Sequence, residues 1–173
     1  MALEDLFAQT VEEWKTHCYN KSFSSNTNDY LNCDAYRSIV LMGPLILPLI
    51  YQELKKEPPS SEYFTQEINK FKLKHFDTID ITLGNEEFDR LEQDPEYKQF
   101  SHNYDRDTTG TPDFLWSYVV KKIVPEFELS QGNKESDAAI KDMGCGFVGM
   151  DTQKMVQETI LWLEQNMHQY VQK

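Results

Sequence analysis

The chain has 173 residues and a formal net charge of −12, with 17 lysines and arginines against 29 aspartates and glutamates. Aromatic residues make up 13% of the sequence, which excludes a collagen-like, low-complexity or wholly disordered protein. Because nucleic acids and anionic membranes attract cationic proteins, this charge argues against both as partners. The negative charge remains compatible with a basic protein partner or a bound cation, or it serves only to keep the protein in solution.

The sequence predicts neither a membrane span nor a secretory leader. Its most apolar stretch, residues 39–51, contains two prolines and is shorter than the 18 or more residues that a transmembrane helix needs. The N-terminal residues lack a basic region followed by an apolar one, so no signal peptide is predicted. Cys18, Cys33 and Cys145 are widely spaced and form no Cys-x-x-Cys pair, a pattern typical of reduced thiols. We therefore expect a cytoplasmic protein.

Apolar residues that recur at steps of three and four predict an amphipathic helix over residues 3–19. Residues 22–32, rich in serine and asparagine, predict a loop. Asp34 is then expected to cap a helix over residues 35–42 that ends at Gly43.

Pro44 suits the first turn of a following helix over residues 45–56, whereas Pro48 is expected to distort the start of that helix. A helix, a Gly-Pro pair and a second helix are typical of a tight helical hairpin.

Residues 58–112 read as an acidic insertion. They predict a helix over 60–75, a weak strand signal or an extended loop over 76–83, and a short helix capped by Asn85. Residues 77–107 contain ten acidic and three basic residues, so this stretch carries −7 of the total charge.

The C-terminal part predicts two more helices. Asp113 is expected to cap a helix over 114–124, and Asp151 the longest helix, over 152–171. Each of the three tryptophans lies on the apolar stripe of a predicted helix, Trp14 on the N-terminal one, and all are expected in the core: Trp14, Trp116 and Trp162. The fold class is therefore mainly α, with a single compact helical domain over residues 1–173.

Three stretches of the sequence carry a resemblance: residues 11–15 with the Ser24-Ser25 pair, residues 35–54, and residues 116–124. They resemble a widespread family of small bacterial proteins of unknown function. That family has a Val-Glu-x-Trp-Lys start, an Ala-Tyr-x-x-Ile-x-x-Met-Gly hairpin with Leu-Pro-Leu-Ile, and an aromatic helix rich in tryptophan. A terminal helix with a Trp-Leu pair, here Trp162-Leu163, follows.

The resemblance covers residues 8–57 closely and 113–165 loosely, and it departs from the family in two places. Residues 58–112 intervene where the aromatic helix of the family follows its hairpin directly. Residues 123–125, Ile-Val-Pro, stand where the family has an Ile-Thr-Gly turn. The resemblance implies a compact helical fold and brings no catalytic residues.

Gly144, Gly146 and Gly149 match the letters of the dinucleotide-binding pattern G-x-G-x-x-G. That pattern needs a preceding strand and a βαβ unit, whereas the residues before Gly144 predict a helix and too few residues follow for a second strand. The segment instead predicts a turn before the Asp151 cap. An alternative remains, in which the glycine amides bind an anion and Cys145, near a helix N-terminus, reacts as a thiolate.

Residues 105–116 partly match a calcium-binding loop, with Asp105 and Asp107 at positions one and three and Gly110 at position six. Position twelve should be a bidentate glutamate but is Trp116, so two ligand oxygens are lost. The four histidines show no metal-ligand spacing. We therefore predict no metal site and no cofactor.

These patterns favour a non-enzymatic, cytoplasmic protein-interaction module, with an inhibitor or immunity-type protein for a basic partner as its more specific form. The alternative is a small-molecule or anion-binding protein, or an enzyme, that uses Gly144, Cys145, Gly146 and Gly149. A calcium-binding loop at 105–116 is the third hypothesis. The predicted partner-binding residues are the acidic side chains of the insertion: Asp77, Asp80, Glu86, Glu87, Asp89, Glu92, Asp94 and Glu96.

Overall fold

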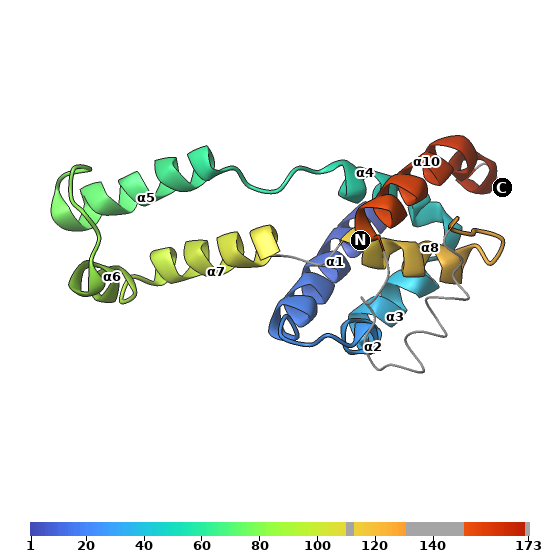
Figure 1. Ribbon diagram of the computed structural model, residues 1–173, viewed down its shortest axis with the longest axis horizontal. Helices are drawn as coiled ribbons and strands as arrows, with labels where there is room; N and C mark the ends of the chain where they lie inside the picture. Colours follow the sequence, from blue (N-terminus) through green and yellow to red (C-terminus); the bar gives the residue numbers. More distant parts are fainter. Residues whose placement is uncertain (110–112, 131–150, 172–173) are drawn as a thin grey trace. The chain divides into compact units, whose positions relative to one another are not determined.

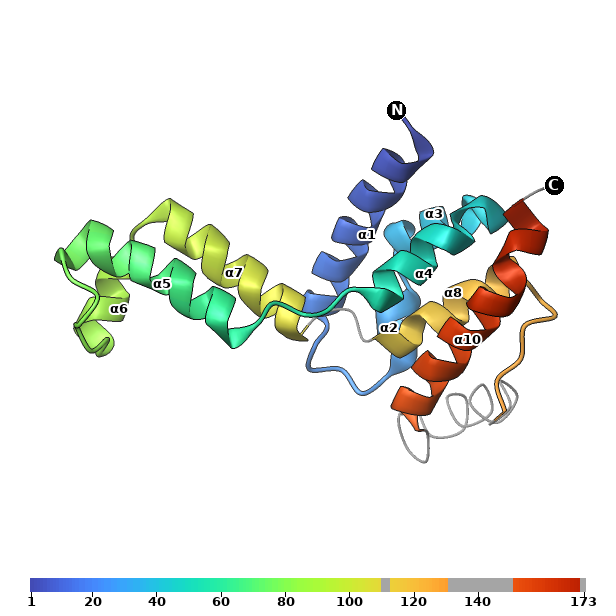
Figure 2. The same ribbon diagram turned by 90° about the horizontal axis from the view of Figure 1, so that it is seen from above.

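A computed structural model describes residues 1–109, 113–130 and 151–171 (Figures 1 and 2). The described residues are mostly helical and contain no strand, which confirms the mainly α fold. The chain divides into two compact units: the main unit, formed by residues 1–56 and 111–173, and the inserted unit, residues 57–110. The sequence predicts one domain with an acidic insertion, whereas the structure gives that insertion a hydrophobic core of its own.

Helix α1, Leu3–Asn20, begins the main unit. It buries most of the apolar stripe that the sequence predicts, but Leu6, which belongs to that stripe, is exposed. The loop expected over residues 22–32 contains a further short helix, α2, Thr27–Leu31. Helix α2 starts there because the Asn26 side chain accepts a hydrogen bond from the amide of Asn28 at 3.1 Å, which satisfies a free donor of the first turn.

The helical hairpin of the main unit differs in detail from the expected one. Helix α3, Asp34–Leu41, is capped by the Cys33 thiol, whose Sγ accepts the amide of Tyr36 at 3.5 Å, rather than by Asp34. Gly43 has φ +72°, a left-handed conformation that favours glycine. The chain then forms a 3₁₀ turn, η1, Gly43–Ile46, and helix α4, Leu47–Lys55, with Pro48 in its first turn.

The expected second helix is therefore split, because Pro48 lacks an amide and is accommodated where a helix leaves its amides free. Within the described ranges no single helix has both the length and the apolar character to cross a membrane. The α3 helix and residues Gly43–Lys55 meet that test only as a pair bent by 101°.

Two C-terminal helices, the first preceded by a 3₁₀ turn, also belong to the main unit. A 3₁₀ turn, η2, Asp113–Leu115, leads into helix α8, Trp116–Ile123, so Asp113 lies in η2 rather than at a helix cap. Helix α10, Thr152–Val171, has the predicted cap, since Asp151 Oδ1 accepts the amide of Lys154 at 3.0 Å. Helix α1 packs on α3, and α10 packs against α4 and α8 (Figure 2).

The tryptophans lie where the sequence predicts, with one difference in depth. Trp14 and Trp116 are buried, and their rings meet edge to face with centroids 5.0 Å apart. Trp162 is only half-buried, and its ring packs against Phe127 at 5.1 Å.

Helix α10 provides a test of this core. Leu163 is fully buried, whereas Leu161, two residues earlier, is 53% exposed. We expect Leu163→Ala to lower the free energy of unfolding by about 3 kcal/mol, because it removes apolar burial and leaves a cavity. Leu161→Ala should change it by less than about 0.5 kcal/mol. Urea unfolding followed by tryptophan fluorescence measures both values, and equal losses would show that α10 packs through a different face.

Candidate functional site

The inserted unit is built from three helices. Helix α5, Ser61–Phe76, and helix α7, Pro95–Thr109, lie side by side, and helix α6, Asn85–Leu91, lies at one end of the pair (Figures 1 and 2). Their core contains four buried residues with four partly buried ones against them: Ile68, Phe71, Leu91 and Tyr97, with Phe64, Phe76, Leu83 and Phe100.

Helix α7 is not among the helices that the sequence predicts, because most of its residues are polar. Its signal is an aromatic stripe, Tyr97, Phe100 and Tyr104, at steps of three and four behind the Asp94-Pro95 pair, a start in which proline is the first helical residue. These rings pack against three rings of α5, those of Tyr63, Phe64 and Phe71. The closest ring centroids are 4.7 Å apart for Phe64 and Tyr104 and 5.4 Å apart for Phe71 and Tyr97. The aromatic packing therefore joins α5 to α7.

Residues 77–84, between α5 and α6, form an extended connection and no strand, as the loop interpretation expects. Asp77 ends α5 with φ +60°, and Thr78 Oγ1 accepts the amide of Asp80 at 3.1 Å. Gly84, rather than Asn85, is the N-cap of α6. Its amide donates to Glu87 Oε2 at 3.1 Å, so Glu87 has a structural role in the capping box.

Asp94 is buried and does not belong to an exposed binding surface, which corrects its place among the predicted partner-binding residues. Its Oδ2 accepts from Lys74 Nζ at 2.8 Å and from His75 Nε2 at 2.7 Å, and its Oδ1 accepts the amide of Glu96 at 2.9 Å. The hydrogen bonds from Lys74 and then His75 hold the pKa of Asp94 well below its ordinary value of 3.8. Asp94 therefore connects the end of α5 to the start of α7.

The other predicted carboxylates divide into two groups. Glu87 is half-buried in its cap, and Glu96 lies 3.6 Å from Lys74. The remaining five are exposed and form no ion pair with any residue that the structure describes: Asp77, Asp80, Glu86, Asp89 and Glu92.

Two large apolar side chains in residues 77–92 are exposed. Ile79 is 48% exposed and Phe88 is 40% exposed. The stretch has one cation, Arg90, whose guanidinium lies 5.2 Å from the centroid of the Phe76 ring. We call the exposed acidic and apolar residues of this stretch the acidic end: Asp77, Ile79, Asp80, Glu86, Phe88, Asp89 and Glu92.

The alternative sites are not supported by the described residues. Gly144, Cys145, Gly146 and Gly149 lie outside them, as does the helix expected before Gly144. Asp105 and Asp107, two positions apart in helix α7, point to different sides of it and do not converge as calcium-loop ligands would. In the described ranges no three histidine, cysteine, aspartate or glutamate side chains lie where they could hold a metal ion.

No protein-family model, curated protein or solved structure matches the chain. The resemblance to a bacterial family is therefore still a prediction, and a functional proposal depends on the geometry alone.

Asp94 provides a test of how the inserted unit is held together. We expect Asp94→Asn to increase hydrogen exchange across α5 and α7, because it removes the charge that Lys74 and His75 contact. Since the folded pKa of Asp94 is depressed, its stabilising effect should be complete above about pH 3.8 and be lost as the pH falls below that value.

Asp89→Asn, at an exposed and unpaired carboxylate, is the matched control and should leave exchange unchanged. All three tryptophans belong to the main unit, so tryptophan fluorescence reports whether that unit stays folded. Unaltered exchange in Asp94→Asn would show that the buried carboxylate does not stabilise this unit.

Proposed function

We propose that the protein is a non-enzymatic, cytoplasmic interaction module that binds a basic protein through the acidic end. The observation that carries the proposal is the presence, on one small helical unit, of five exposed carboxylates without an ion pair to any described residue, together with exposed Ile79 and Phe88. An inhibitor or immunity-type protein, which must find and cover one cationic partner, is the specific form that we favour.

The charge of the acidic end would act mainly on the rate of encounter. Unpaired carboxylates steer a cationic surface during diffusion and reject partners of the same sign, while contributing less to the lifetime of the complex. Residues 77–107 carry more than half of the excess charge of the chain, so this attraction is concentrated on a short segment.

The two exposed apolar side chains would contribute to the lifetime of the complex. Aromatic and large aliphatic residues that become buried at the centre of an interface carry much of the binding energy, and the surrounding polar residues exclude water from them. Phe88 on α6 and Ile79 on the preceding connection are next to carboxylates of the acidic end in the sequence. The aromatic core between α5 and α7 supports this arrangement, which reduces the entropy that binding has to overcome.

The contribution of charge can be tested with four neutral substitutions. Asp80→Asn, Glu86→Gln, Asp89→Asn and Glu92→Gln together change the net charge from −12 to −8. Affinity capture from an extract of the source cells, with the full-length protein as bait, should recover a basic protein that this variant loses. With that partner purified, we expect an association rate constant about tenfold lower and a weaker dependence on salt.

The control for this test makes the same change in charge elsewhere. Glu4, Glu57, Glu62 and Glu128 are also exposed, and their replacement by glutamine gives a second variant with a charge of −8. It should bind like the unmodified protein. Equal losses in the two variants would indicate attraction to total charge, and the absence of any basic partner would contradict the proposal.

The apolar contribution can be tested separately. We expect Phe88→Ala to increase the dissociation rate constant of the same complex about tenfold and to leave the association rate nearly unchanged. Leu73→Ala, at a residue of α5 that is 53% exposed and outside the acidic end, is the control. Surface plasmon resonance measures both rates, and an unchanged dissociation rate would remove Phe88 from the interface.

A further inference from the structure

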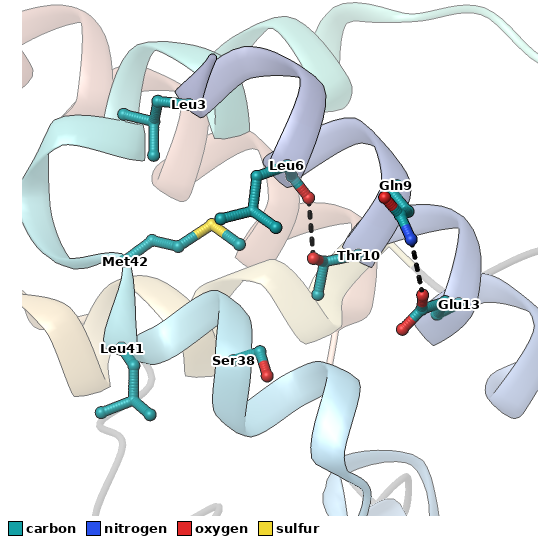
Figure 3. A pocket seen from close by; sticks show the side chains of 8 residues that line it. All are labelled: Leu3, Leu6, Gln9, Thr10, Glu13, Ser38, Leu41 and Met42. Carbon is teal, nitrogen blue, oxygen red and sulfur yellow. Dashed lines mark hydrogen bonds between the residues drawn. The ribbon is translucent and has the colours of Figure 1, made fainter. Parts of the chain in front are cut away.

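A groove in the main unit runs between helices α1 and α3 and encloses about 600 Å³ (Figure 3). Its lining residues come from α1, α3 and the residue that follows α3: Leu3, Leu6, Gln9, Thr10, Glu13, Ser38, Leu41 and Met42. All the residues of this groove belong to the main unit, so it is a different surface from the acidic end.

The walls of the groove are apolar at one end and polar at the other. Leu3, Leu6 and Met42 lie near one another around the start of α1, whereas Gln9 and Glu13 lie further along that helix (Figure 3). Leu6 is 43% exposed and Leu41 is 86% exposed. The buried stripe of α1 does not include Leu6, so this leucine is available for contact without any change in the core.

The polar end carries negative charge that the described residues do not neutralise. Glu13 is exposed and accepts only a 3.4 Å hydrogen bond from the Gln9 amide, with no ion pair in the part of the chain that the structure describes. The cations of α1 and α3 are engaged elsewhere. Lys15 Nζ lies 3.5 Å from Glu53, and Arg37 donates to Asp34 at 2.8 Å.

Because exposed leucines and a carboxylate without an ion pair to any described residue line the same groove, we infer that the groove binds a cationic amphipathic helix of a partner protein. Apolar residues of that helix at i, i+3 and i+4 contact Leu6, Leu41 and Met42, and a lysine or arginine further along pairs with Glu13. A second copy of this chain is a poorer occupant, because two chains of charge −12 repel each other. The inference does not depend on the acidic end.

The probe for this inference is a synthetic helical peptide of about 14 residues, with leucines on one face and lysines on the other. A second peptide has glutamates in place of the lysines. The protein is labelled with ¹³C at its methionine methyl groups, so that Met42 reports on the groove and buried Met155 serves as an internal reference. We expect the lysine peptide to shift the Met42 resonance saturably and the glutamate peptide to leave it unchanged.

Substitutions then locate the contact. Leu6→Asp and Leu41→Asp should each weaken binding about tenfold, whereas Leu161→Asp, at a residue of α10 that is 53% exposed and outside the groove, should not. Glu13→Gln should weaken binding about threefold and reduce its dependence on salt. Circular dichroism checks that each variant is folded. We expect folding to be retained, because the substituted leucines are exposed.

Several results would overturn the inference. They are an unchanged Met42 resonance, equal binding of the glutamate peptide, or an equal loss in Leu161→Asp. Dimerisation that Leu41→Asp abolishes would also overturn it, because the occupant would then be a second copy. If peptide binding were lost only when the carboxylates of the acidic end are neutralised, the groove would not be the binding site. The proposed function would be unaffected by that result.

Discussion

The main unit depends on the burial of Trp14. Its indole N–H donates to the carbonyl of Tyr30 at 2.8 Å, so the one polar group of this large side chain is satisfied inside the core. Its ring contacts the Trp116 ring edge to face, and its ring centroid lies 5.7 Å from that of Tyr36. These two contacts join α1 to α3 and α8. This interior excludes water well enough that burial raises the pKa of Tyr36 to about 12. Because Trp14 holds α1 in the core, Leu6 and Glu13 of the same helix can remain exposed.

The inserted unit achieves its order by other means. It has only a small aliphatic core and uses aromatic packing between α5 and α7 instead. Asp94 adds a buried carboxylate that both caps α7 and receives Lys74 and His75 from α5. The hydrogen bonds from Lys74 and His75 fix the end of α5 against the start of α7, while the hydrogen bond from the Glu96 amide caps α7 itself. The unpaired charges are thereby confined to the connection and the short α6 helix.

The two surfaces proposed for binding share one chemical preference and differ in form. The acidic end is highly charged and also contains the exposed side chains of Phe88 and Ile79. The groove between α1 and α3 is concave and apolar, with Glu13 as its charged residue. Each would select a cationic partner surface, the first by electrostatic steering and the second by the shape of an amphipathic helix. The net negative charge of the protein favours a cationic partner at either surface.

The sequence by itself determined the helical class, the amphipathic stripe of α1, the hairpin around Gly43 and the Asp151 cap, because these features follow from local periodicity and side-chain capping. It also located the acidic segment. It missed α7, whose apolar side is three aromatic rings in a polar stretch, and it assigned Asp94 to the surface. Only the tertiary structure decided these points, because the burial of Asp94 depends on hydrogen bonds from Lys74 and His75, which lie 20 and 19 positions away in the chain. The groove was equally hidden, since a stripe of leucines predicts burial until the packing of neighbouring helices shows which of them stay exposed.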